Sequence, residues 1–182
     1  MTPIGNTEAG YGAIAIALHW GMAALLIGLA VLGLYMVALP DVGFDTRKIV
    51  LILYHKELGM LALALFAVRL AWRVTNILPH LVEELPDWQK VIARFVHLCF
   101  YALMFALPMT GWLMSSAAGF PVSFLQLFTF PDLIGPNDYL FKRLIDIHKW
   151  LSYALLVLLV VHAAAALRHR FAYRDGASRM LP

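Results

Sequence analysis

Four long stretches of hydrophobic residues, separated by polar segments, dominate the pattern along this 182-residue chain. Each stretch is long enough for the roughly 20 residues that a helix needs to cross the hydrocarbon core of a bilayer. Lys56 and Glu57 interrupt the second stretch, and Pro108 predicts a kink in the third that neighbouring helices can accommodate. The expected helices cover residues 13–35, 49–72, 91–114 and 146–168.

The composition agrees with a membrane protein. Apolar residues make up 62% of the chain and charged residues 14%, whereas soluble proteins have about 45–50% and about 25%. The net charge of +3 is too small and too scattered to indicate nucleic-acid binding. The sequence therefore predicts an all-α fold, an integral membrane four-helix bundle that forms a single domain over residues 1–182. The aromatic segment before the last helix is expected to lie at the membrane interface.

Four crossings place both termini on one side of the membrane, and the Lys and Arg residues indicate which side. Eight basic residues fall on the side of the termini and six on the opposite side. The excess favours cytoplasmic termini. The eight are Arg69, Arg73, Lys90, Arg94, Arg168, Arg170, Arg174 and Arg179, and the six are Arg47, Lys48, Lys56, Lys142, Arg143 and Lys149.

The single cysteine, Cys99, excludes an internal disulfide, a C-x-x-C-H haem attachment site and a thiolate cluster. Any redox cofactor must therefore be held by other ligands. Histidines within the apolar stretches are the candidates, because ionisable groups inside a membrane are rare and commonly functional. A lone histidine near a helix end can equally serve as an interfacial hydrogen-bonding residue.

Helix direction indicates which histidines can meet. His19 and His162 lie about 10 and 9 Å from the side of the termini, at ~1.5 Å per residue. His55 and His148, counted from the opposite side, form a second pair at matching depth. Along the last helix, the two histidines are 14 residues apart, which is about 40° short of four full turns, so both face the same neighbours. Their axial separation of about 21 Å suits two stacked cofactors and is too long for one shared metal.

Two imidazoles on facing helices, without Cys, Asp or Glu at the same depth, fit bis-histidine coordination of haem iron, whereas structural zinc normally takes four protein ligands. Small residues support this interpretation, since Gly59 and Ala163–Ala166 would let a flat macrocycle approach the backbone. Such residues also serve ordinary helix packing. A proton or metal path without haem is the alternative, and it predicts a purified protein with no Soret band.

Several motifs occur in order along nearly the whole chain: HW at His19, H-x-x-x-G at His55, H-L-x-x-Y at His97 followed by ALPMTGW, and HAAAAL-x-H at His162. With them the chain resembles the bacterial cytochrome b561 family, and within it most of all the short four-helix diheme proteins described as superoxide oxidases. The resemblance implies two haem b groups, one held by His19 and His162 and the other by His55 and His148. It also implies a multi-pass protein of the bacterial inner membrane that passes electrons from periplasmic superoxide to ubiquinone.

Two further histidines are candidates for the quinone. His169 follows His162 by seven residues, on nearly the same stripe and about 10 Å nearer the cytoplasm. An imidazole there could donate a proton to quinone, as the resemblance favours, or simply belong to the basic R-H-R cluster. His97 has no partner at its depth and is expected to bond a haem propionate or to lie near that quinone. His80 is expected to be a loop residue.

The six basic residues on the external side could attract an anion such as superoxide, pair with haem propionates or bind lipid headgroups. Lys56 and Lys149, each adjacent to an expected haem ligand, are the candidate catalytic residues for substrate entry. The leading hypothesis is thus a superoxide:quinone oxidoreductase. The alternative is an electron-transfer subunit that links a partner dehydrogenase or soluble cytochrome to the quinone pool, although a protein partner is not required.

Overall fold

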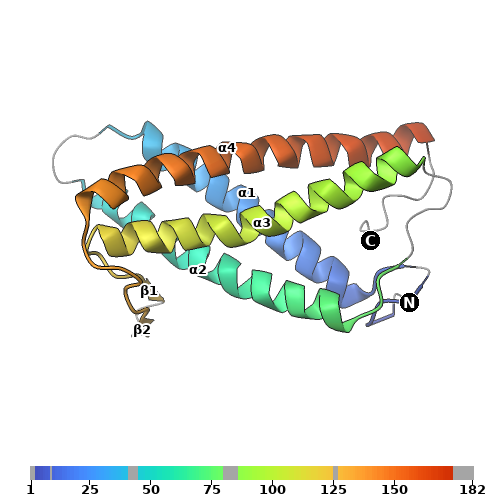
Figure 1. The fold of residues 1–182 in the computed structure, drawn as a ribbon, viewed down its shortest axis with the longest axis horizontal. Helices are drawn as coiled ribbons and strands as arrows, with labels where there is room; N and C mark the ends of the chain where they lie inside the picture. Colours follow the sequence, from blue (N-terminus) through green and yellow to red (C-terminus); the bar gives the residue numbers. More distant parts are fainter. Residues whose placement is uncertain (1–2, 9, 41–44, 80–85, 125–126, 174–182) are drawn as a thin grey trace.

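The computed structural model describes residues 3–8, 10–40, 45–79, 86–124 and 127–173. The four helices all run from one end of the molecule to the other and cross one another obliquely (Figure 1), and each is long and apolar enough to cross a membrane. The chain packs α1 on α2, α2 on α3 and α3 on α4. The start of α1 and the end of α4 lie at the same end of the bundle. The helices are α1 Ala13–Ala38, α2 Thr46–Thr75, α3 Asp87–Ala117 and α4 Asp138–Arg168.

The helices extend past the apolar stretches from which they were predicted. Helix α4 begins at Asp138 rather than near 146, because the side chain of Asn137 accepts a hydrogen bond from the backbone N–H of Leu140 at 3.0 Å and caps the helix. Asp45 caps α2 in the same way, through the N–H groups of Arg47 and Lys48. Hydropathy marks only the part of a helix that suits lipid, whereas the polar cap marks where the helix begins.

Pro108 lies inside α3, and the helix continues past it to Ala117. At the other end of the chain, α4 passes into one π-helical turn, His169–Tyr173. The four-helix membrane fold predicted from the sequence is therefore present, with α3 uninterrupted at its proline.

A small apolar layer occupies the middle of the bundle. Met22 and Leu26 of α1, Met104 and Leu107 of α3, and Leu155 of α4 are all buried there. Leu155 lies seven residues from both His148 and His162, so the layer falls between the two levels at which α4 carries its histidines.

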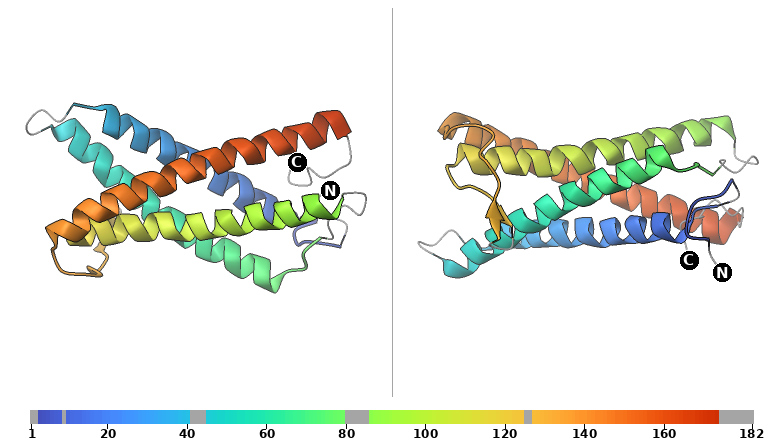
Figure 2. Two further views of the ribbon diagram at one scale, coloured as in Figure 1. Left: turned by 45° about the horizontal axis from the view of Figure 1, so that its top comes forward. Right: turned by 90° about the horizontal axis from the view of Figure 1, so that it is seen from below.

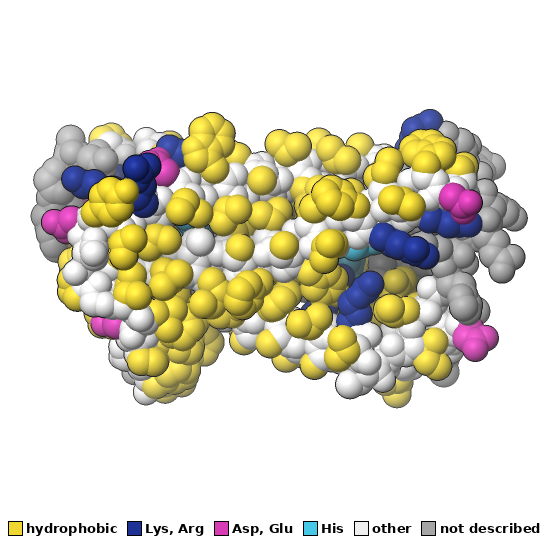
Figure 3. Space-filling model, viewed as in Figure 1, with side chains coloured by type: hydrophobic (Ala, Val, Ile, Leu, Met, Phe, Trp, Pro, Cys, Tyr) yellow, Lys and Arg dark blue, Asp and Glu magenta, His cyan; other side chains and the backbone are white. Residues whose placement is uncertain are grey.

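Most other large hydrophobic side chains point outward. On the face seen in Figure 3, they cover the length of the bundle, while charged side chains gather mainly toward its two ends. An outward apolar surface of this kind suits a protein whose solvent is lipid.

The segment between α3 and α4 turns back along the outside of the bundle toward α2 (Figure 2). It contains a short antiparallel hairpin of β1 Ser123–Phe124 and β2 Phe128–Thr129. Two hydrogen bonds hold the later part of this segment against α3. The Trp112 indole N–H donates to the Pro131 carbonyl at 3.1 Å, and the Leu133 N–H donates to the Ser116 hydroxyl at 3.1 Å. The position of this segment at the membrane interface remains a prediction.

Candidate functional site

The structure brings together both histidine pairs that the helix directions suggested. The imidazoles of His19 on α1 and His162 on α4 face each other with ring centroids 6.2 Å apart. Those of His55 on α2 and His148 on α4 also have centroids 6.2 Å apart. Helix α4 therefore supplies one member of each pair, and the His19–His162 and His55–His148 pairs lie on opposite sides of the apolar layer.

The spacing of the rings fits a pair of axial ligands. Two metal–nitrogen bonds of ~2 Å, with each nitrogen about 1.1 Å from its ring centroid, give about 6 Å between the centroids of two imidazoles on opposite sides of one metal ion. Moreover, α1 and α4 pack little against each other over their described residues. The donor chemistry, the ring spacing and the loose packing of α1 on α4 thus fit a haem held between two histidines.

Glycines border the rings of the His55–His148 pair. A Cβ added at Gly33 would lie 3.5 Å from Cε1 of His55, and one added at Gly111 would lie 3.5 Å from Cε1 of His148. A Cβ at Gly59, one turn after His55, would meet nothing within 4 Å. The backbone therefore leaves room on this level of the bundle, as the small residues of the sequence suggested.

The two pairs differ in the polar groups that surround them. At the His55–His148 pair, Thr110 of α3 has its hydroxyl oxygen 3.0 Å from Nδ1 of His148, while Nδ1 of His55 is buried and has no hydrogen-bond partner among the described residues. At the His19–His162 pair, the guanidinium of Arg69 donates to Nδ1 of His19 at 3.2 Å and to the Leu18 carbonyl at 3.3 Å.

The hydrogen bond from Arg69 determines which tautomer a neutral His19 ring adopts. Arginine has only donors, so Nδ1 of His19 is the acceptor, and a neutral ring then carries its proton on Nε2. An Nε2 bond to iron requires the other tautomer, in which Nδ1 carries the proton. A neutral His19 that held iron through Nε2 would carry its proton on Nδ1, and Arg69 would then no longer donate to that nitrogen.

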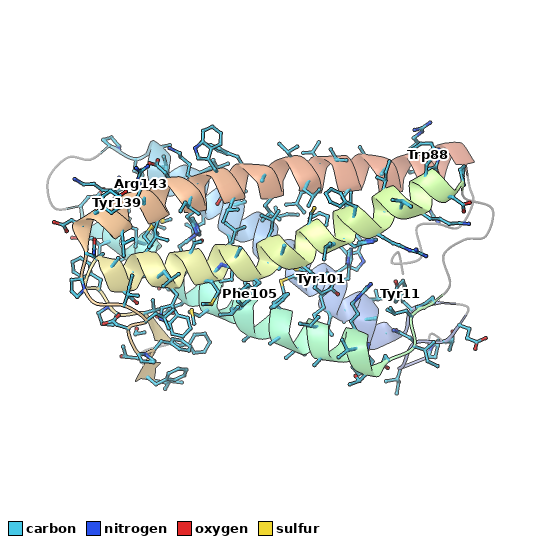
Figure 4. The ribbon with its side chains drawn as sticks, in the orientation of Figure 1. Tyr11, Trp88, Tyr101, Phe105, Tyr139 and Arg143 are labelled. Carbon is cyan, nitrogen blue, oxygen red and sulfur yellow. The ribbon has the colours of Figure 1, made fainter. Side chains whose placement is uncertain are left out.

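His97 lies beside the His19–His162 pair, although the sequence offered it no partner. Its ring centroid is 5.9 Å from that of His162, and Phe100 approaches the same ring to 5.2 Å. Arg73 places its guanidinium carbon 5.3 Å from the ring centroid of Tyr101, which Figure 4 labels on α3. Two arginines of α2 and a third histidine thus surround this pair. No group of three His, Cys, Asp or Glu in the described part of the chain could hold a metal ion by itself.

His169 occupies the start of the π-helical turn, half-buried, at the same end of the bundle as the His19–His162 pair. The sequence predicted that His169 lies at this end of the bundle. His80 falls outside the described residues, as do Arg174 and Arg179.

Lys56 and Lys149 have different surroundings. Lys56 is half-buried, and its ammonium lies 5.9 Å from the ring centroid of Phe120, in the segment between α3 and α4. Lys149 is exposed and forms an ion pair with Asp146 at 2.9 Å. Lys149 is therefore paired at the exposed surface with a residue of its own helix, whereas the charge of the half-buried Lys56 is screened less by solvent.

Three of the other basic residues at this end of the bundle have hydrogen-bond partners of their own. Arg47 donates to the Tyr35 hydroxyl, and Lys48 donates to the Leu39 carbonyl at 3.3 Å, so both are tied to the end of α1. Arg143 donates to the Tyr139 hydroxyl at 3.3 Å within α4, where Figure 4 labels both residues.

Sequence reasoning did not identify Arg69 and Thr110 as partners of the histidines. For Arg69 a signal existed, because it follows His55 by 14 residues and so stays on nearly the same face of α2, at the level of the other pair. For Thr110 no comparable signal existed, since its contact depends on how α3 rotates against α4.

Comparison with known proteins agrees with this architecture. The family model of prokaryotic cytochrome b561 matches residues 10–182. Cytochrome b561 homolog 2 of Escherichia coli K12 is 33% identical over 177 residues, which cover 97% of this chain and 93% of that relative. Cytochrome b561 homolog 1 of the same organism is 29% identical over 129 residues, covering 70% and 73%. The chain therefore belongs to the prokaryotic cytochrome b561 family, the haem b-binding, multi-pass electron-transfer proteins of membranes.

Proposed function

We propose that this protein is a diheme cytochrome b of the bacterial inner membrane that transfers electrons from superoxide on the periplasmic side to ubiquinone on the cytoplasmic side. The observation that carries the proposal is the presence of two facing histidine pairs on opposite sides of the apolar layer. Two such pairs provide ligands for two haems, one in each half of the bundle. Each bound haem would supply a one-electron iron couple.

In this proposal, His55 and His148 hold the periplasmic haem, and His19 and His162 hold the cytoplasmic haem. His148 and His162 are 14 residues apart, or about 21 Å along α4 at ~1.5 Å per residue. Helix α4 therefore sets the separation of the two groups. The orientation rests on the sequence, in which eight basic residues fall on the side of the termini and six on the opposite side.

At the periplasmic end, Lys56 follows His55 directly and presents a half-buried ammonium. A cation beside the entry point raises the local concentration of an anionic substrate. Two superoxide anions would each release one electron and leave as dioxygen. At the cytoplasmic end, one quinone would take up the two electrons and two protons to become the quinol, with His169 as proton donor and His97 nearby.

The direct test is superoxide consumption by the purified protein with and without added ubiquinone. We expect catalytic consumption that requires the quinone, with one quinol formed for every two superoxide anions. The spontaneous dismutation of superoxide, measured with haem-free protein, is the control. Protein that is inactive alone, but is reduced by a partner dehydrogenase or soluble cytochrome, would instead indicate an electron-transfer subunit.

The ligand assignment predicts that His148→Ala and His162→Ala each remove a different haem b. Because each pair holds one group, either variant should retain about half of the parental haem, and the two variants should lose different spectral components. Haem content per protein and reductive titration of the absorbance bands measure this. Retention of both haems by either variant contradicts the assignment.

The lysine environments predict unequal effects on substrate entry. Lys56→Gln should reduce the rate of haem reduction by superoxide by roughly two- to tenfold and flatten its dependence on ionic strength, since salt screens steering. Lys149→Gln removes an exposed cation, whose field water and salt screen more than that of the half-buried Lys56, so it should have a smaller effect, and the double variant should be no faster than Lys56→Gln. Stopped-flow reduction at several salt concentrations is the measurement. An unchanged rate and salt slope in the double variant would exclude steering by these lysines.

His169→Ala should leave both haems bound and reducible from outside, and slow their reoxidation by a water-soluble quinone analogue. A proton donor contributes about 10²–10⁴-fold to the step it serves, although electron transfer can mask part of the loss. Arg170→Ala, which removes an exposed member of the same basic cluster, is the matched control. If His169→Ala reoxidises at the parental rate from pH 6 to 8, His169 belongs to the basic cluster only, and His97 becomes the next residue to test.

A further inference from the structure

Thr110 occupies a position that the proposed function does not use. It follows Pro108 by two residues in α3 and is half-buried against α4. Its hydroxyl oxygen lies 2.8 Å from the Leu107 carbonyl oxygen and 3.0 Å from Nδ1 of His148. The next residue, Gly111, has no side chain and lets the same imidazole lie close to the α3 backbone. Thr110 and Gly111 together line one side of the His148 ring.

The contacts of Thr110 indicate the direction of the two hydrogen bonds. A hydroxyl has one proton to donate and can accept through its lone pairs, whereas a carbonyl can only accept. With the Thr110 proton directed to the Leu107 carbonyl at 2.8 Å, the Thr110 oxygen accepts from Nδ1 of His148, and the Leu107 carbonyl is a second acceptor beside the same ring. It follows that the proton of His148 is on Nδ1, which leaves the lone pair of Nε2 for a metal ion.

His19 and His55 lack this arrangement. Nδ1 of His19 accepts from Arg69, which places the proton of the neutral ring on Nε2. Nδ1 of His55 is buried without a hydrogen-bond partner among the described residues. His148 is thus held in the ligand tautomer by the protein itself, while His19 and His55 are not.

We propose that Thr110 is a positioning residue for haem at the His55–His148 pair, because it fixes the tautomer and the ring orientation of His148. This inference rests on the proposed role of His148 as an iron ligand. Partners that accept from the second nitrogen of a ligating histidine raise its basicity, and their loss typically costs about 10–100-fold in metal affinity or activity. A more basic ligand favours the ferric state, so the Thr110 hydroxyl would lower the reduction potential of a haem at this pair relative to a variant without the hydroxyl.

The test compares Thr110→Val, Thr110→Ser and Ser152→Ala in the purified, haem-loaded protein. Valine keeps the shape of threonine and removes the hydroxyl, whereas serine keeps the hydroxyl. Ser152 provides a matched control, because its hydroxyl donates to the backbone carbonyl of His148 at 2.8 Å and does not touch the ring. Potentiometric titration of the absorbance bands reports the potential of each haem, and haem content reports occupancy.

We expect Thr110→Val to favour the ferrous state of one haem by roughly tenfold, an upward shift of about 59 mV for a one-electron couple, and to lower the occupancy of that haem only. Thr110→Ser and Ser152→Ala should match the parent. If Thr110→Val does not accumulate, Thr110→Ala provides a second variant without the hydroxyl and carries the same expectation.

Parental potentials and occupancy in the hydroxyl-free variant would overturn the role of Thr110. A shift in Thr110→Ser or Ser152→Ala as large as in Thr110→Val would also overturn it, because the effect would then come from packing. These failures are distinct from failure of the ligand assignment, which His148→Ala tests by itself. If His148→Ala loses one haem while Thr110→Val keeps the parental potentials and haem occupancy, only the inference about Thr110 is wrong.

Discussion

The facing of two imidazoles across the bundle, repeated at two levels of α4, is the interaction on which the rest of this structure depends. Helix α4 carries His148 and His162 on nearly one face, and it meets α2 at one level and α1 at the other. Polar rings buried in an apolar bundle are costly unless they find partners. Nδ1 of His148 finds Thr110 and Nδ1 of His19 finds Arg69, whereas Nδ1 of His55 has no hydrogen-bond partner among the described residues.

The apolar packing of the bundle is correspondingly sparse. The buried cluster at its centre is the layer around Leu155, and most large hydrophobic side chains elsewhere face outward. In lipid there is no hydrophobic gain from burying these outward side chains, so helix association depends on close packing, polar contacts and whatever lies between the helices. A bundle with a small central layer, room at the His55–His148 level and loose packing of α1 on α4 suits a protein that holds haem in its interior.

The two ends of the bundle differ in their polar chemistry. The His55–His148 pair is held by a neutral threonine, and Lys56 is the nearby cation that remains available to an anion. The His19–His162 pair is surrounded by Arg69, Arg73 and His97, from two other helices. Electrons that cross the proposed path would therefore enter beside Lys56 and leave among proton-bearing and cationic groups. This asymmetry agrees with a one-electron donor at one end and a proton-coupled acceptor at the other.

The sequence by itself determined the four membrane helices and the pairing of their histidines, because hydropathy and the 3.6-residue repeat act along the chain. A histidine's depth follows from counting residues, and the alternating direction of the helices then permits only certain partners. Helix ends were less well predicted, since caps such as Asn137 contribute nothing to hydropathy.

Only the tertiary structure decided which side chains hold the rings. Thr110 reaches His148, and Arg69 reaches His19, because of the rotation of α3 against α4 and of α2 against α1. Lys149 and Lys56 looked equivalent in sequence, yet one is paired with Asp146 on its own helix and the other lies half-buried beside Phe120. Spacing along a chain determines the depth and face of a residue within its helix. The hydrogen bonds that select a histidine tautomer depend on distances of a few ångströms between helices, which only their packing defines.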